Sequence, residues 1–141
     1  MTASPIVVDS SAIIAILLKE PERALFLSVL DDSADACCSA VTFVETFMVA
    51  MSHVPNFTFD RYIAVMNGLG IRRIPVDEEQ GEISAQAFLR FGKGRHPARL
   101  NLGDCFSYAL AKSLTAPLLY KGEDFGRTDI VAAVPSQEPR A

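Results

Sequence analysis

Short apolar runs alternate along this chain with longer segments in which apolar residues recur every three or four positions. The short runs have the length of β-strands, and the longer segments have the spacing of helices that bury one face. We therefore expect strands at residues 6–8, 34–39, 71–76, 116–120 and 130–135. We expect helices at residues 11–18, 21–30, 41–53, 59–70, 77–91 and 102–114.

The alternation of strands with helices is typical of βαβ units. Such units build a parallel sheet with helices on both faces, and strands buried on both sides read as continuous apolar runs. We therefore expect an α/β fold with a central, mostly parallel sheet of four to five strands. A chain of 141 residues suits one such domain. We place it at residues 1–135, followed by a loose C-terminal tail at residues 136–141.

The composition is that of an ordinary globular protein, with 50% apolar and 21% charged residues. No apolar run approaches the ~20 residues of a transmembrane helix. The N-terminus lacks the basic region of a secretory signal, so we expect a cytoplasmic protein. Cys37, Cys38 and Cys105 lack the spacing of zinc ligands, and we expect all three to be free and buried.

A net charge of −4 gives no general reason to expect a polyanionic partner. The local distribution differs, because residues 90–99 contain Lys93, Arg95 and Arg99 and no acid. This basic segment is either a solvated connection or a loop that faces phosphates.

Asp9 stands where the first apolar strand meets the first apolar helix, a place poorly able to solvate a charge. One explanation is capping, since Asp9 or Ser10 could accept the free backbone N–H groups of that helix. Another is a functional site, because ligand sites of open parallel sheets lie beyond the carboxyl ends of the strands.

Three other acids stand in similar surroundings. Glu45 and Asp104 each lie in an apolar helix with hardly another charge, and Asp124 follows a buried strand. Each has a structural explanation, as a buried ion-pair partner, a helix N-terminal residue and a turn former respectively. A parallel sheet would nevertheless gather these acids and Asp9 at one edge, where their repulsion calls for a cation. Mg²⁺ or Mn²⁺ is the hard, oxygen-binding ion that suits them.

Carboxylate-bound Mg²⁺ is suited to phosphodiester hydrolysis, because it can hold the phosphate and lower the pKa of a bound water. The sequence contains no Ser-His-Asp arrangement, P-loop or dinucleotide-binding glycine pattern that would favour other chemistry. The basic segment precedes Asp104 and could grip flanking phosphates.

Four segments that carry these acids resemble the PIN-domain family, and most closely its VapC-type toxin ribonucleases. They are IVVDSSAIIAILLKEPE, SAVTFVETFMV, LNLGDCFSYALAK and PLLYKGEDFGRTDI, and they occur in the family's order. The resemblance implies a PIN-like three-layer fold and a Mg²⁺-dependent endoribonuclease that is the toxin of a VapBC-type toxin–antitoxin system. It also implies RNA as substrate, a homodimer, and a VapB-type antitoxin that blocks the acidic groove, often with an arginine.

Carried over by position, the resemblance makes Asp9 and Asp104 the principal Mg²⁺ ligands, with Mn²⁺ as a substitute. Glu45 completes the acidic cluster. Asp124 is the expected fourth acid, although the neighbouring Glu123 could face the metal instead.

The remaining expectations are less specific. Ser11 either holds the Asp9 carboxylate or simply starts a helix, and Asp129 either lines the site or caps the segment that follows. Lys121 either contacts phosphate or pairs with a nearby carboxylate. The expected RNA-phosphate contacts are Lys93, Arg95 and Arg99. The apolar residues that belong either to the core or to a dimer face are Phe43, Phe47, Met48 and Met51.

A non-catalytic Mg²⁺-binding module is the main alternative, either a PIN-like domain without activity or a receiver-like domain. A receiver domain needs two adjacent acids after its first strand, whereas Ser10 follows Asp9 here. A phosphatase of the haloacid-dehalogenase type needs a second Asp at the position of Ser11. The filled acidic positions favour the ribonuclease over an inactive PIN-like domain.

Overall fold

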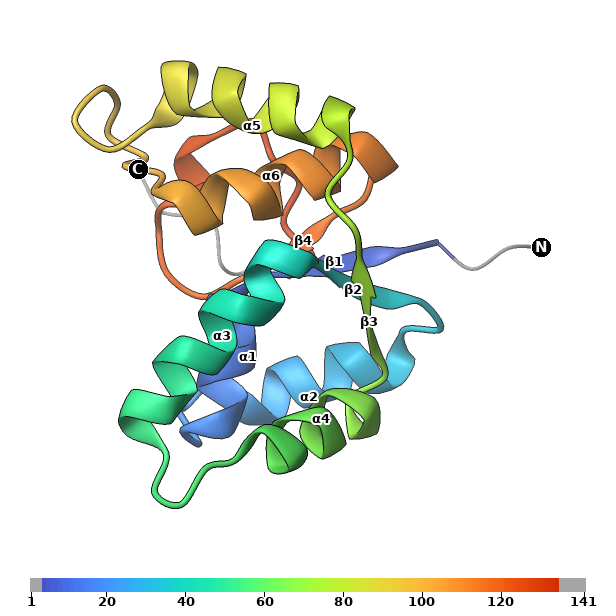
Figure 1. Cartoon of the computed structure of the whole chain (residues 1–141). Helices are drawn as coiled ribbons and strands as arrows, with labels where there is room; N and C mark the ends of the chain where they lie inside the picture. The colour runs from blue at the N-terminus through green and yellow to red at the C-terminus, as the bar shows by residue number, and fades with distance from the viewer. Residues whose placement is uncertain (1–3, 135–141) are drawn as a thin grey trace.

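Within residues 4–134, which the computed structural model describes, four short strands form the central sheet (Figure 1). The strands are β1 (Ile6–Val8), β2 (Ala36–Ser39), β3 (Ile71–Ile74) and β4 (Leu118–Leu119). They are all parallel and pair in the order β3-β2-β1-β4. The expected α/β fold with a parallel sheet is confirmed. The residues of β1, β2 and β4 are all buried. Exposed strand residues, Arg72 and Arg73, occur on β3, which lies at an edge of the sheet.

Helices connect the strands, and most begin at a side chain that caps them. The helices are α1 (Ser10–Leu17), α2 (Arg23–Asp32), α3 (Ala40–His53), α4 (Phe59–Gly68), α5 (Glu78–Phe91) and α6 (Leu102–Leu114), and a 3₁₀ helix, η1 (Phe125–Arg127), follows β4. A side-chain oxygen accepts a free backbone N–H group at the start of five of them. These caps are Asp9, Ser39, Thr58, Asp77 and Asn101.

The helices form two layers, one on each face of the sheet. Figure 1 shows α5 and α6 above the sheet and α1 to α4 below it. Successive residues of a strand point to opposite faces, so Ile6 and Val8 pack in the core between the sheet and α1 to α4. Val7 packs in the second core, beneath α5 and α6. This arrangement is the three-layer fold expected from the continuous apolar strands.

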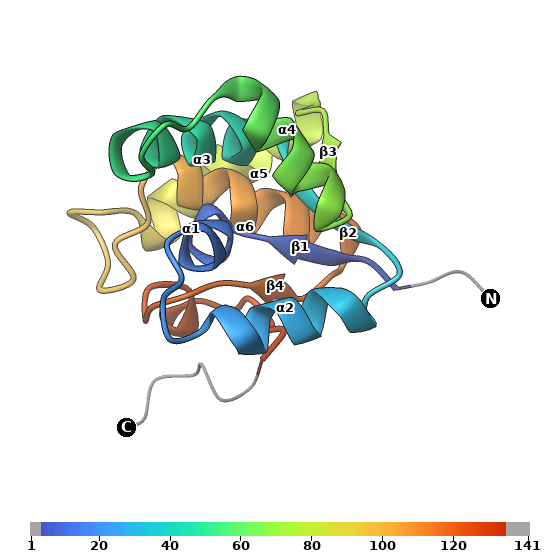
Figure 2. The ribbon, with the colours of Figure 1, turned by 90° about the horizontal axis from the view of Figure 1, so that it is seen from below.

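The direction in which strands are added to the sheet reverses at β1. From β1 the chain moves to β2 and then to β3 on one side, and it returns to place β4 on the other side. Figure 2 shows β1 and β4 side by side, with α1 running on from the end of β1. The carboxyl end of β1 is therefore the switch point where open parallel sheets bind ligands.

The expected last strand at 130–135 is wrong as a strand. Among the described residues 130–134, only Ala132 pairs with the sheet, through an isolated parallel bridge to Leu118. Because β4 has only two residues, it offers a partner for little more than one residue of the following segment. The expected tail at 136–141 and the domain boundary at 135 lie outside the described residues.

Two further expectations concern composition. The three cysteines are buried and free, as predicted. Among the helices of the described part of the chain, none combines the length and the apolar character that a membrane span requires.

Candidate active site

Asp9 lies at the carboxyl end of β1 and is 1% exposed. Its Oδ2 atom accepts hydrogen bonds from the backbone N–H of Ser11 at 3.0 Å and from the Ser11 hydroxyl at 2.7 Å. Asp9 therefore does cap α1, and Ser11 does hold the Asp9 carboxylate. The Ser11 hydroxyl accepts in turn from the backbone N–H of Lys121 at 2.9 Å, which links this corner to the segment after β4.

The second oxygen of Asp9 has a partner that the sequence did not reveal. Ser107 of α6 donates a hydrogen bond to Asp9 Oδ1 at 2.5 Å, and the Ser107 hydroxyl lies 3.2 Å from that of Thr42 on α3. Both hydroxyl-bearing side chains are buried. A buried serine in an apolar helix carries no sequence pattern of its own, so only the packing of α6 against β1 identifies it.

Glu45 reaches the same corner from the second turn of α3. Its Oε1 atom accepts a hydrogen bond from the hydroxyl of Ser10 at 2.8 Å. Burial raises the pKa of Glu45, the bond from Ser10 opposes this, and the charge of Asp9 raises it further. Within residues 4–134 Glu45 forms no ion pair, so its alternative role as a buried ion-pair partner is wrong.

Asp104 lies in the first turn of α6 and belongs to a capping box. Its backbone N–H donates to the Asn101 side chain at 2.9 Å, and its carboxylate accepts from the Asn101 backbone at 3.0 Å. Burial and the charge of Asp9 raise the pKa of Asp104, and the charges of Glu45 and Asp124 act in the same direction. The bond from Asn101 opposes them, and the resulting pKa is about 7. All four predicted acids therefore interact electrostatically, and we call Asp9, Glu45, Asp104 and Asp124 the acidic cluster.

Asp124 and Glu123 have different surroundings. Asp124 precedes η1, has no hydrogen bond to the helix from its side chain, and acts on Asp104. Glu123 is exposed and lies 3.6 Å from Arg127, with which it forms an ion pair. Asp124 is thus the better fourth member of the cluster.

A glycine allows α6 to approach Glu45. A Cβ atom at Gly103 would overlap the carboxylate of Glu45. A glycine in the first turn of an otherwise strong helix is the sequence signal that could have identified this position, because glycine disfavours helices.

Asp129 is engaged elsewhere. It accepts a hydrogen bond from the hydroxyl of Tyr108 at 2.7 Å and forms ion pairs with Lys112 at 2.9 Å and Arg90 at 3.8 Å. Burial raises the pKa of Asp129, but the bonds from Lys112 and Tyr108 outweigh it and lower the pKa. Asp129 fastens the end of the described chain to α5 and α6 instead of joining the cluster.

Lys121 also has carboxylate partners. Its Nζ atom lies 3.2 Å from Glu20 and 3.4 Å from Glu22. The pairing alternative is therefore confirmed for Lys121. A receiver-like domain would need this lysine at the acidic cluster.

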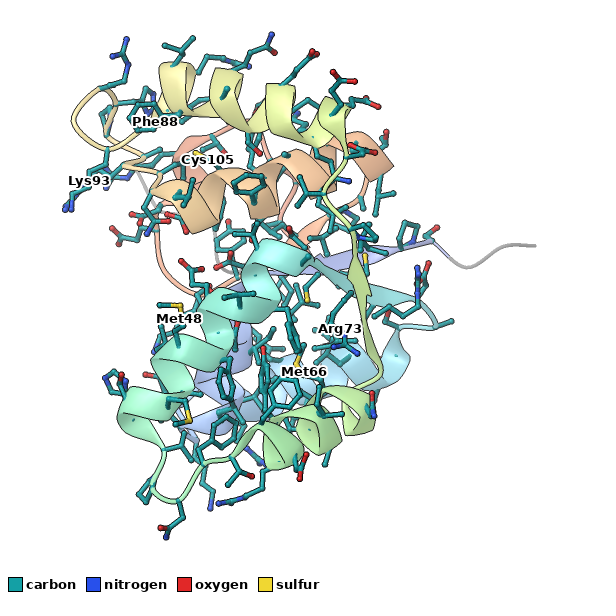
Figure 3. All side chains as sticks on the ribbon, in the orientation of Figure 1. Met48, Met66, Arg73, Phe88, Lys93 and Cys105 are labelled. Carbon is teal, nitrogen blue, oxygen red and sulfur yellow. The ribbon has the colours of Figure 1, made fainter. Side chains whose placement is uncertain are left out.

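The basic loop, residues 92–100, connects α5 to α6. It closes on itself through the hydrogen bond from Lys93 N to Leu100 O at 2.9 Å and its reciprocal from Leu100 N to Phe91 O. Lys93, Arg95 and Arg99 are exposed, and no carboxylate of the described residues pairs with them. Figure 3 shows Lys93 projecting from the loop. Three uncompensated cations therefore precede the helix that carries Asp104.

An apolar groove borders the acidic cluster. It lies between α3 and the start of α6, has a volume of about 760 Å³, and includes Glu45 in its lining. Val44, Met48 and Leu102 line it and are 54%, 65% and 73% exposed. Figure 3 shows Met48 projecting from α3. Phe43 and Phe47, by contrast, pack against the core, so the predicted stripe divides into core and surface residues.

The donor set of the acidic cluster suits a hard divalent cation. Its ligating atoms are carboxylate oxygens, and none of the ion pairs within residues 4–134 involves them. No three acidic, histidine or cysteine side chains of that range are arranged to hold an ion together. Mg²⁺ commonly uses only one or two protein carboxylates and keeps several waters, so a site for it does not require three such side chains.

Comparisons with known proteins agree with this geometry. The PIN domain family matches residues 6–131. The "Ribonuclease VapC" of Mycolicibacterium smegmatis is 39% identical over 126 residues, which are 89% of this chain and 98% of that protein. The "Ribonuclease VapC42" of Mycobacterium tuberculosis is also 39% identical, over 88% of this chain and 95% of its own length.

Two solved structures share the fold. One is the Mycobacterium tuberculosis VapC20 structure, described as a sarcin-ricin loop cleaving toxin, with a TM-score of 0.72 and 16% identity over 89% of this chain and 96% of that one. The other is a toxin-antitoxin complex from Klebsiella pneumoniae, with a TM-score of 0.67 and 16% identity over 92% and 98% of the two chains.

Proposed function

This chain belongs to the PIN-domain family, among its VapC ribonucleases, and we propose that it is a Mg²⁺-dependent endoribonuclease and the toxin of a VapBC-type toxin–antitoxin pair. The observation that carries the proposal is the acidic cluster at the switch point of the sheet. Asp9, Glu45 and Asp104 lie there without a cation among the described ion pairs. Burial and mutual repulsion raise the pKa of Glu45 and Asp104, as expected for a site built around a positive charge.

Each acid has a role in this proposal. Asp9 and Asp104 hold the Mg²⁺ ion, for which Mn²⁺ can substitute, while Glu45 and Asp124 complete the negative charge around it. Such an ion supplies Lewis-acid stabilisation of a phosphodiester and acidifies water. Ser11 and Ser10 orient Asp9 and Glu45 through the hydrogen bonds described above.

The basic loop binds the RNA backbone in this proposal. Lys93, Arg95 and Arg99 carry exposed charges without carboxylate partners in the described structure, so they are available to phosphates. Phosphate contacts position a nucleic acid without reading its sequence. The loop leads directly into α6, whose first turn carries Asp104, so RNA held by the loop would run towards the acidic cluster.

The partner in this proposal is a VapB-type antitoxin. The lining of the apolar groove combines apolar side chains with the carboxylate of Glu45. A peptide with apolar side chains and a nearby cation matches that combination, and its cation would block the acidic cluster. The structural likeness to a chain from a toxin-antitoxin complex is compatible with this partner.

We also infer a homodimer from the exposed apolar residues of α3. Val44, Met48 and Met51 are 54%, 65% and 51% exposed and follow one another at helical spacing. Val44 and Met48 also line the apolar groove, so the dimer and the antitoxin would share part of this face. Contiguous apolar surface of this kind marks an interaction site.

The experiment that tests the ribonuclease is cleavage of total cellular RNA by the purified protein with Mg²⁺, with Mn²⁺ and with EDTA. We expect discrete fragments that disappear with EDTA and in Asp9→Asn and Asp104→Asn. Asparagine keeps an accepting side-chain oxygen for the helix cap at position 9 and for the capping box at position 104, so we expect both variants to fold. Glu123→Gln removes a neighbouring acid outside the cluster and should cut like the parent. Equal cutting by parent, Asp9→Asn and Asp104→Asn would overturn the proposal.

A further inference from the structure

A chain of buried hydroxyl groups reaches Asp9 from the two helices that carry the other acids. Thr42 lies on α3, one turn before Glu45, and Ser107 lies on α6, one turn after Asp104. Residues one turn apart lie on the same face of a helix. Each of these two helices therefore also presents a hydroxyl group to the interior. The two hydroxyl groups contact each other, and that of Ser107 contacts Asp9.

The direction of these hydrogen bonds follows from the count of protons. Ser107 has one hydroxyl proton, and Ser107 uses it to donate the bond of 2.5 Å to Asp9 Oδ1. The contact of 3.2 Å between Thr42 and Ser107 must then have Thr42 as the donor. The relay runs from Thr42 to Ser107 to Asp9.

The same count shows which lone-pair positions of the Asp9 carboxylate remain free for a ligand. Each carboxylate oxygen has about two lone-pair positions. Among the described residues, Oδ2 accepts two hydrogen bonds, both from Ser11, and Oδ1 accepts one, from Ser107. One position on Oδ1 is thus left for an ion, and Ser107 determines where it points.

We propose that Ser107 and Thr42 are positioning residues. They aim the free lone pair of Asp9 at the metal, and they hold α3, α6 and the end of β1 in fixed relative positions. This inference rests on the proposed function. Ser107 and Thr42 are 0% and 1% exposed, so they contact neither RNA nor solvent and act through Asp9. Partners that orient a metal ligand typically change metal affinity 10–100-fold when removed.

The test is Mn²⁺ binding by isothermal titration calorimetry, together with kcat and KM for RNA, in the full chain. For Ser107→Ala we expect the Mn²⁺ dissociation constant to rise about tenfold or more. kcat should fall at subsaturating Mn²⁺, and KM for RNA should stay unchanged. Thr42→Val, which keeps the side-chain shape, should show a smaller loss in the same direction. Thr42→Ser, which keeps the hydroxyl group, should match the parent.

Ser84→Ala is the matched control. Ser84 is a buried serine of α5 that donates to the backbone of α6 at Cys105, 3.3 Å away, and does not touch Asp9. It should bind Mn²⁺ like the parent. If the parent binds Mn²⁺ and cuts RNA but Ser107→Ala and Thr42→Val behave like it, only the relay is overturned. If the parent neither binds Mn²⁺ nor cuts RNA, the proposed function fails, and the relay's role fails with it.

Discussion

Gly103 lies so close to Glu45 that a Cβ atom at position 103 would overlap the Glu45 carboxylate. The first turn of α6 can therefore approach α3 only because position 103 has no side chain. The same turn carries Asp104, so this close approach also determines the distance between two acids of the cluster.

Gly103→Ala should displace either Glu45 or the start of α6. We expect a loss of RNA cleavage together with a destabilisation of about 1–3 kcal/mol, the usual cost of overpacking. Denaturant unfolding and cleavage assays measure the two effects. Gly81→Ala provides the control, since a Cβ atom at Gly81 in α5 meets nothing within 4 Å. That variant should be more stable by about 0.5–1 kcal/mol and fully active, and an equal response of both variants would contradict the steric account.

The pKa of Asp104, raised to about 7 from its ordinary 3.8, predicts a pH dependence of stability. Between these values the folded protein keeps a proton that the unfolded chain has lost, so this group lowers stability as pH rises from about 4 to about 7. In EDTA the parent should lose more stability than Asp104→Asn over this range, as measured by thermal unfolding. Mg²⁺ should raise the melting temperature of the parent more at pH 8 than at pH 5. Parallel pH profiles of parent and variant would contradict the prediction.

Neutralising the basic loop should weaken RNA binding without affecting the acidic cluster. In the triple variant Lys93→Gln, Arg95→Gln, Arg99→Gln, the slope of log affinity against log salt should fall by about 2, since each phosphate contact to a single strand contributes about 0.7. Filter binding in EDTA measures this slope in the absence of cleavage. Lys19→Gln changes a lysine in the turn that follows α1, outside the basic loop, and should leave the slope unchanged. An unchanged slope in the triple variant would exclude the loop from the RNA interface.

Asp129 should matter for stability but not for chemistry. Asp129→Asn weakens the ion pair with Lys112 and the hydrogen bond from Tyr108. We expect a loss on the order of 1 kcal/mol in the free energy of unfolding and an unchanged kcat. Because the pKa of Asp129 is lowered on folding, its contribution is present at neutral pH and is lost as pH falls. A large fall in kcat would contradict this prediction and indicate that Asp129 takes part in the active site.

The apolar face of α3 should control association. Met48→Lys places a charge at a position that is 65% exposed, so the monomer should fold normally while a dimer would lose stability. Light scattering over a concentration series should show a dimer for the parent and a monomer for the variant. Leu25→Lys changes an exposed apolar residue on α2 and serves as the control. A parent that stays monomeric at all concentrations would contradict the homodimer.

The sequence determined the fold class and three of the four acids of the cluster. Apolar runs of strand length between helical segments specify a parallel sheet, because only strands buried on both faces dispense with polar positions. Asp9, Glu45 and Asp104 were identifiable because a charge in an apolar segment is costly and calls for a reason. These signals lie within short stretches of the sequence, so they can be read without knowing how the elements pack.

Only the tertiary structure decided which partner each polar group found. Nothing local distinguishes Asp124 from Glu123, or shows that Asp129 and Lys121 belong to ion pairs away from the cluster. Ser107 meets Asp9 across 98 residues of sequence, and a serine carries no pattern that announces such a contact. Hydrogen bonds and close approaches depend on distances of a few ångströms between elements, and those distances exist only once α3 and α6 have packed against β1.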